Sequence, residues 1–236
     1  MYRLVKFGVC DVLIRPYTTR DELELLEFLT FTDYENDDMY EHAVDEFINR
    51  FVKKDFVLNT KIEKIIMLLS IRNITLGDEF NIEVTCPYCN RKHKMKITLS
   101  DIVSNASEYN DCVKHKFVCS SNLDDTISMP EDDDMDMNEY EYITSHITDY
   151  MTIFNDTIPV TCSCGKHSTA SISSYRLILS LMSDDSFNTL TNWIHALVCD
   201  GKHTRSDVLD MTPVQRMMER KYFEDAQKTQ KEINIG

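Results

Sequence analysis

The sequence predicts an α+β protein in which N-terminal helices and C-terminal helices flank a small antiparallel sheet. Apolar residues recur at helical spacing in the first third of the chain and again in the last quarter. Between these regions, residues 80–85 and 94–99 alternate apolar and polar side chains, as half-buried strands do. These patterns divide the 236 residues into three predicted parts, which are 1–78, 79–172 and 173–236.

The N-terminal part, residues 1–78, is predicted to be mainly helical. Residues 21–31 begin with acidic residues, which suit the positive end of a helix dipole, and carry leucines on one face. The segments 40–52 and 60–71 repeat this apolar periodicity. Such stripes are typical of helices that pack against a core.

The central part, residues 79–172, is predicted to be a small sheet that carries two cysteine hairpins. A strand–turn–strand pattern at 158–172 complements the two strands described above. A long insertion separates this second pattern from the first two strands. It contains EDDDMDMNEYE at 131–141, where seven of eleven residues are acidic. Mutual repulsion predicts a solvated loop or the start of a helix at this segment.

The C-terminal part, residues 173–236, is predicted to be helical. Apolar spacing indicates helices at 175–182 and 187–198, and Thr212 and Pro213 are typical of the N-cap and first position of a last helix. Three methionines lie near this last helix: Met211, Met217 and Met218. We expect them to face the core of the protein, although methionine also suits adaptable partner surfaces.

Charge and composition exclude several classes of protein. The 40 acidic and 25 basic residues give a net charge of −15, which repels phosphate backbones and anionic lipid. Five glycines are too few for a glycine-rich dinucleotide loop. The first residues do not form a secretory signal, and the longest apolar stretch is too short to span a bilayer. We therefore expect a soluble protein kept in a cytoplasm, with reduced cysteines.

Two cysteine motifs share one pattern and form the strongest chemical signal. The first reads IEVTCPYCNRKH at 82–93 and the second reads IPVTCSCGKH at 158–167. Both contain I-x-V-T-C, a second cysteine, then Asn or Gly, and then a basic residue and a histidine. This predicts an internal repeat of one hairpin turn, here called a knuckle, in which Asn90 and Gly165 adopt positive φ.

The two knuckles predict a zinc-ribbon-like site that binds one structural zinc ion. Two thiolates at the tip of each hairpin can bind one side of a tetrahedral ion, and nearby basic residues offset the negative charge. The expected ligands are four cysteines, with two histidines as reserve ligands or donors to the sulfurs: Cys86, Cys89, Cys162 and Cys164, with His93 and His167. Four thiolates leave no open position for water, so the ion would be structural. Outside the motifs, Cys199 and His195 are expected to pack in the core.

Two other uses of the same residues remain open. The C-P-Y-C spacing of Cys86 and Cys89 also suits a thiol–disulfide enzyme, although that motif normally opens a helix. Basic residues between Arg91 and Lys96 suit a zinc-ribbon regulator that binds nucleic acid or polymerase, although the net charge opposes it. No nucleophile elbow, P-loop or zinc-protease motif is present, which favours a protein that is not an enzyme and has no catalytic residues.

The knuckles and the segments after them resemble the T4 bacteriophage base plate proteins, the baseplate hub proteins of T4-like tailed phages. The resemblance rests on the strand–knuckle units, then SSYRLILSLMSDDSFNTLTNWIHALV, and then GKHTRSDVLDMTPVQRMMERKYFED. It implies a structural or assembly protein of the baseplate hub that acts by docking other phage tail and baseplate proteins. It implies a late protein that is in the host cytoplasm during assembly and in the virion baseplate if it is retained. The net charge of −15 predicts neither nucleic acid nor membrane as a partner.

Overall fold

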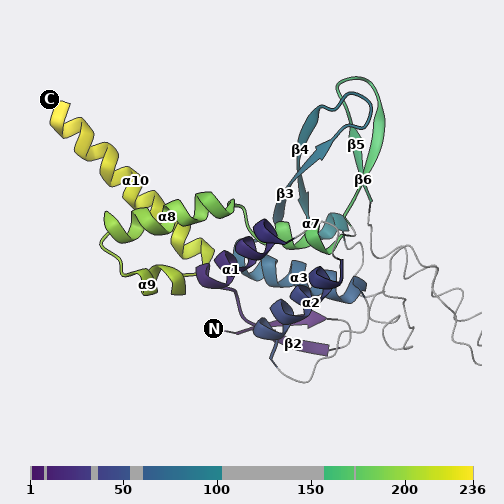
Figure 1. Cartoon of the computed structure of the whole chain (residues 1–236), viewed down its shortest axis with the longest axis horizontal. Helices are drawn as coiled ribbons and strands as arrows, with labels where there is room; N and C mark the ends of the chain where they lie inside the picture. Colours follow the sequence, from purple (N-terminus) through teal and green to yellow (C-terminus); the bar gives the residue numbers. More distant parts are fainter. Residues whose placement is uncertain are drawn as a thin grey trace, which may run out of the picture.

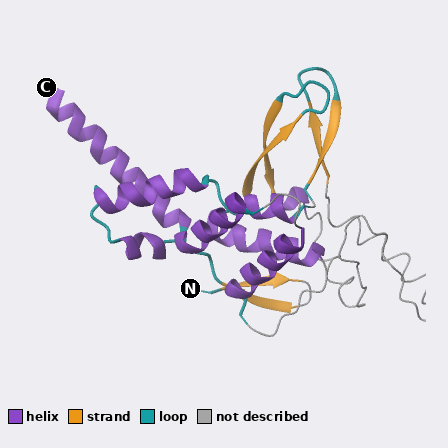
Figure 2. Ribbon diagram, viewed as in Figure 1, coloured by secondary structure: helices purple, strands orange, loops and turns teal. Residues whose placement is uncertain are grey.

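The computed structural model describes residues 2–7, 10–32, 37–53, 61–102, 157–172 and 174–235, and it confirms the α+β class (Figures 1 and 2). Helices form a central body. Two β-hairpins stand out from this body side by side and are here called the arm. The last helix extends away from the body in another direction. The predicted acidic segment at 131–141 lies outside the described residues.

The N-terminal part contains the three predicted helices. They are α1 (Thr19–Phe31), α2 (Asp37–Phe51) and α3 (Lys61–Leu76). A capping box begins α1, because the Thr18 hydroxyl accepts from the Asp21 N–H and the Asp21 carboxylate accepts from the Thr18 N–H. Helix α3 runs beyond the predicted end because its apolar residues continue.

A hairpin before α1 was not predicted. Strand β1 (Arg3–Phe7) pairs antiparallel with β2 (Cys10–Ile14), in a register that sets Arg3 opposite Ile14. Ile14 is fully buried and forms an isolated bridge with Val52 after α2. The first residues are therefore a short hairpin on the helical body, and the expectation of a mainly helical start holds only from α1 onward.

The arm consists of two separate two-stranded sheets in place of the single predicted sheet. Strands β3 (Glu79–Thr85) and β4 (Lys92–Thr98) form one antiparallel hairpin, followed by the short helix α4 (Leu99–Ile102). Strands β5 (Thr157–Thr161) and β6 (His167–Ser171) form the other. The alternating burial of β3 and β5 confirms the predicted period of two, since their apolar side chains share one side.

The C-terminal part contains four helices in its described residues. They are α7 (Tyr175–Ser180), α8 (Phe187–Cys199), α9 (Arg205–Asp210) and α10 (Pro213–Ile235). Thr212 caps α10 as predicted, because its hydroxyl accepts from the Gln215 N–H at 3.3 Å. Helix α9 was not predicted, although Thr204 and Asp207 form a capping box at its start. None of the described helices is both long and apolar enough to cross a membrane.

Two apolar clusters hold the body together. The larger one joins residues of β2, α1, α2, α3, the base of the arm and α7. The smaller one joins α1 to α8 and α9 through Leu26, Leu190, Leu197 and Val208. Helix α1 contributes Leu25 to the first cluster and Leu26 to the second, so it lies between them. The boundaries proposed at 78/79 and 172/173 remain predictions.

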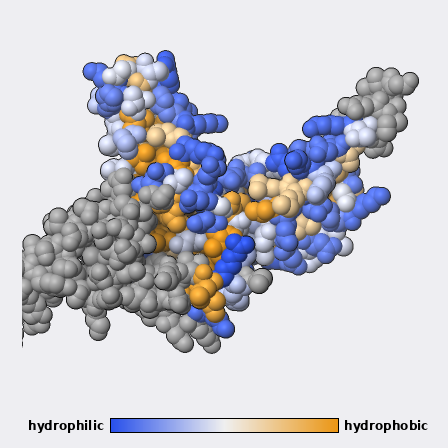
Figure 3. Space-filling view, turned by 180° about the vertical axis from the view of Figure 1, so that it is seen from behind, coloured by the Kyte–Doolittle hydropathy of each residue, from blue (hydrophilic) through white to orange (hydrophobic). Residues whose placement is uncertain are grey.

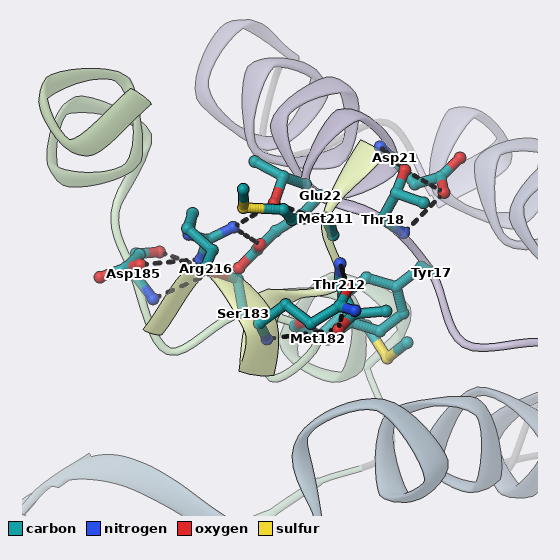
Figure 4. A network of polar contacts seen from close by, with 12 residues as sticks. Tyr17, Thr18, Asp21, Glu22, Met182, Ser183, Asp185, Met211, Thr212 and Arg216 are labelled. Carbon is teal, nitrogen blue, oxygen red and sulfur yellow. Dashed lines mark hydrogen bonds and ion pairs between the residues drawn. The ribbon is translucent and has the colours of Figure 1, made fainter. Parts of the chain in front are cut away.

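A buried ion-pair network fastens α10 to α1 (Figure 4). Arg216 and Glu22 have side chains only 4% and 1% exposed, and Arg216 Nη1 lies 2.5 Å from Glu22 Oε2. Arg216 Nη2 also donates to Asp185 Oδ2 at 3.1 Å. The Ser183 hydroxyl donates to the second Glu22 oxygen at 2.6 Å. The network therefore joins α1, α10 and the turn between α7 and α8.

A second buried arginine fastens the same turn from α3. Arg72 donates to the carbonyl oxygens of Leu181 at 2.6 Å and Gly77 at 2.8 Å, and to Asp184 Oδ1 at 3.0 Å. The Tyr17 hydroxyl donates to the Met182 carbonyl. Burial, followed by the charge of Glu22, raises the pKa of Tyr17 well above its ordinary value, so this hydroxyl stays protonated. Carbonyls at the end of α7 thereby find donors.

We expect Arg216→Ala to lower the free energy of unfolding by about 3–5 kcal/mol, because it leaves the buried Glu22 carboxylate without its partner. Urea denaturation followed by circular dichroism measures this change. Arg20→Ala is the matched control, since Arg20 pairs with Asp210 at the surface and its loss should cost less than about 1 kcal/mol. Equal losses in the two variants would contradict the structural role given to the buried pair.

Candidate metal centre

The four predicted cysteines lie at the tip of the arm, where the two hairpin turns meet (Figure 1). In the first knuckle, Cys86 directly follows β3, and its N–H donates to the Arg91 carbonyl at 2.9 Å. The Asn90 N–H donates back to the Cys86 carbonyl at 2.9 Å. This closed turn fixes the direction in which Cys86 and Cys89 leave the backbone.

The second knuckle repeats these hydrogen bonds within a shorter turn. The Cys162 N–H donates to the Lys166 carbonyl at 3.0 Å, and the Gly165 N–H donates to the Cys162 carbonyl at 2.9 Å. The residue after the second cysteine has positive φ in both turns, 56° at Asn90 and 80° at Gly165. The predicted repeat and its backbone conformation are therefore confirmed.

The sulfur atoms of the four cysteines come together from segments far apart in the chain. All four lie within 4.8 Å of one another. Cys86 Sγ lies 3.9 Å from Cys164 Sγ, and Cys89 Sγ lies 3.5 Å from Cys162 Sγ. Tetrahedral zinc with Zn–S bonds of about 2.3 Å separates its sulfur ligands by about 3.8 Å. The donor set and its spacing therefore fit a four-thiolate zinc ion.

Each knuckle contributes one buried and one exposed cysteine. Cys86 and Cys162 are buried, whereas Cys89 and Cys164 are exposed at the tip. The backbone N–H of Cys164, together with neighbouring side chains, lowers the pKa of Cys162 to about 6. The backbone N–H of Arg91 lowers the pKa of Cys89, but the neighbouring sulfurs raise it to about 11. The cluster thus favours at least one thiolate at neutral pH, which is the form that binds metal.

The two reserve histidines lie outside the sulfur cluster. His93 Nε2 is 3.1 Å from Cys162 Sγ, a position that suits a hydrogen bond to a ligand sulfur. His167 Nδ1 lies 3.2 Å from the Thr161 hydroxyl. Among the described residues, the group of potential metal ligands within mutual reach consists of the four cysteines. The roles of both histidines remain predictions.

The surroundings of the site weaken the two alternative uses of the cysteines. Cys86 follows a strand and not a loop that opens a helix, so the helix dipole that activates a redox cysteine is missing from this turn. Two lysines of the basic segment pair with acids across the hairpin, Lys92 with Glu83 at 2.6 Å and Lys96 with Glu79 at 2.5 Å. These pairs reduce the charge available to phosphates.

Several side chains expected in the core are exposed. Cys199 and His195 lie on the exposed side of α8, with Cys199 Sγ 2.9 Å from His195 Nδ1, so the expectation of core packing is wrong for both. Met217 and Met218 are also exposed on α10, which contradicts their expected place in the core. The apolar neighbours of these residues in sequence gave the wrong signal, because only one side of each helix contacts the body.

The comparison with protein families identifies where this chain belongs. The family described as T4 bacteriophage base plate protein matches residues 4–130, more than half of the chain. The chain belongs to this family. Comparisons with curated proteins and with solved structures gave no match.

The family match and the resemblance seen in the sequence share the first knuckle and otherwise rest on different parts of the chain. The matched residues, 4–130, include the N-terminal helices and the first knuckle with Cys86 and Cys89. The resemblance was based chiefly on the second knuckle and the helices that follow it. The match therefore supports a T4-like baseplate protein independently of those C-terminal segments, while the assignment to the hub remains a prediction.

We expect Gly165→Ala to loosen the second knuckle, because an alanine at a φ of 80° costs about 1–2 kcal/mol although no atom lies within 4 Å of its added Cβ. Hydrogen exchange of the β5 and β6 amides should accelerate by about 5- to 30-fold. Asn90→Gly is the control, since glycine tolerates the φ of 56° at that position. Unchanged exchange in Gly165→Ala would contradict this account of the turn.

Proposed function

We propose that the chain is a structural or assembly protein of the baseplate hub of a T4-like phage tail, and that it acts by docking other tail proteins. The family match over residues 4–130 carries this proposal. A structural role in the baseplate agrees with the family, which suggests a protein that is not an enzyme. The proposed setting is the host cytoplasm during assembly, and the virion baseplate if the chain is retained.

We propose further that one zinc ion per chain binds Cys86, Cys89, Cys162 and Cys164. Two-stranded hairpins are marginally stable by themselves in water, and the arm consists of two such hairpins. Ligands from both knuckles would join their tips across about seventy residues of sequence, since Cys89 and Cys162 are 73 positions apart. Such an ion supplies folding energy and no catalysis, because four thiolates occupy all its positions.

The alternatives explain fewer of these observations. A zinc-ribbon protein that binds nucleic acid needs clustered cations facing phosphates, whereas Lys92 and Lys96 already pair with acids. A thiol–disulfide enzyme would use Cys86 with Cys89 alone, whereas both sulfurs also contact cysteines of the other knuckle, at 3.9 and 3.5 Å. Neither reading accounts for the family match.

We expect the purified full chain to contain about one zinc ion, and we expect Cys86→Ser and Cys162→Ser each to lose it, because a missing thiolate from either knuckle opens the site. Elemental analysis of protein purified under reducing conditions measures the metal content. Cys199→Ser is the matched control, because this exposed cysteine lies outside the cluster and its variant should keep the ion. Metal-free wild-type protein would contradict the zinc site.

The proposed function predicts that a tagged chain purified from cells infected with its phage carries other tail proteins with it. Mass spectrometry of the purified complexes, and of isolated virions, measures this association. The control is the same tagged chain in uninfected cells, where tail proteins are absent. Recovery of the chain from infected cells without any tail protein would overturn the baseplate proposal, whatever the metal content of the chain.

A further inference from the structure

We infer that the tip of the arm is a docking surface for an acidic surface of a partner protein, with Tyr88 at its centre. This inference rests on the proposed function and deepens it, because it names the surface that docks and the chemistry of the partner. The knuckles are thus proposed to serve as a contact site as well as a metal site. The tip is basic, exposes an aromatic side chain and stands away from the acidic body.

Charge is distributed unevenly between the arm and the rest of the chain. The two hairpins, Glu79–Thr98 and Thr157–Ser171, contain five basic and two acidic residues, a net charge of +3. The whole chain carries −15, so the remainder carries −18. Both acids of the arm lie on β3, and the knuckle residues 84–94 and 160–168 contain none. The tip is therefore a basic end on an acidic protein.

Within the described residues, the basic residues of the tip outnumber the acidic residues that lie beside them. Four of them are exposed there: Arg91, Lys92, Lys94 and Lys166. Lys92 pairs with Glu83, and Lys94 lies opposite the same glutamate in the strand register, whereas no ion pair joins Arg91 or Lys166 to an acid among the described residues. A zinc ion with four thiolates would carry about −2, so the four cations, less Glu83 and the zinc site, leave a net charge of about +1 at the tip. Unpaired cations at an exposed tip favour an acidic partner.

An exposed aromatic side chain lies among these cations. Tyr88 is 64% exposed, although it sits between Cys86 and Cys89 in a closed turn. Pro87 precedes it and restricts the backbone, so little backbone entropy is lost when a partner binds this turn. Tyrosine and arginine are the residue types enriched at the centres of protein–protein interfaces. Figure 3 shows the end of the arm as mostly hydrophilic.

The arm carries this surface away from the repulsive charge of the body. Its longest strands have seven residues and therefore span about 24 Å. Surface charges are screened over about 8 Å at physiological ionic strength. An acidic partner at the tip is therefore attracted by the local cations and shielded from the acidic body.

A protein partner fits the tip better than nucleic acid does. Affinity for nucleic acid comes mainly from counterions released at many phosphate contacts, and the tip offers four cations of which one is paired. One rigid tyrosine with a few surrounding charges is instead the arrangement of a small protein interface. We therefore expect an Asp- or Glu-rich protein surface with a recess for the tyrosine ring.

The test is a photo-crosslinking amino acid placed at position 88 of the full chain in cells infected with its phage. Position 222 is the matched control, because Tyr222 is 70% exposed on α10 and equally aromatic. We expect position 88, and not position 222, to crosslink to an identified tail protein within an Asp- or Glu-rich peptide. Lys166→Glu in the same chain should lower the yield by about tenfold, because it repels that peptide.

Lys221→Glu on α10 is the charge control and should leave the yield unchanged, since Lys221 is also an exposed lysine. Unchanged thermal unfolding in both lysine variants confirms that the arm is intact. Crosslinks to nucleic acid, crosslinks to a neutral peptide, no crosslink from position 88, or no effect of Lys166→Glu would each overturn the inference. If tail proteins still co-purify with the chain in those cases, only the docking surface fails; if they do not, the proposed function fails as well.

Discussion

Two buried guanidinium groups set the positions of the other parts of this protein. Arg72 from α3 and Arg216 from α10 both bind the turn between α7 and α8, through Asp184 and Asp185. Arg72 also donates to the Gly77 carbonyl and lies over the Phe80 ring, 4.5 Å from its centroid. It therefore fixes the corner from which the arm leaves the body. A buried cation without these acceptors would be strongly destabilising, so each arginine can be buried only where its carboxylate and carbonyl partners are in place.

The arm is consequently joined at its base and at its tip by different chemistry. At its base, apolar residues of both hairpins, such as Phe80 and Ile158, enter the large core of the body. At its tip, hydrogen bonds and the four sulfurs bring the knuckles together, and Arg91 donates to the Ser163 hydroxyl across them. Because each hairpin alone is marginal, both joints are needed to keep the tip in one arrangement.

The parts of the fold that have a local sequence signal could be predicted. Apolar periodicity located α1, α2, α3 and α8, and the repeated I-x-V-T-C pattern located both knuckles with their positive φ at Asn90 and Gly165. The hairpin before α1 has five-residue strands, as β5 and β6 do, but no repeated motif beside them to reveal the turn. Helix α9 has only six residues, too few for a clear helical period. Arg72 and Arg216 gave no signal, since only tertiary structure shows that a charged residue is buried.

The body and the tip of the arm differ in whether their basic residues pair with acids of the chain. In the body, Arg72 and Arg216 each find carboxylates of the chain itself, so these charges serve the fold and offer nothing to a partner. At the tip, Arg91 and Lys166 lie exposed, and no ion pair joins them to an acid among the described residues. The four cations of the tip exceed the combined charge of Glu83 and a four-thiolate zinc site, about −3, by one. The excess is explained by contact with an acidic surface, which is where a protein that assembles by docking would place it.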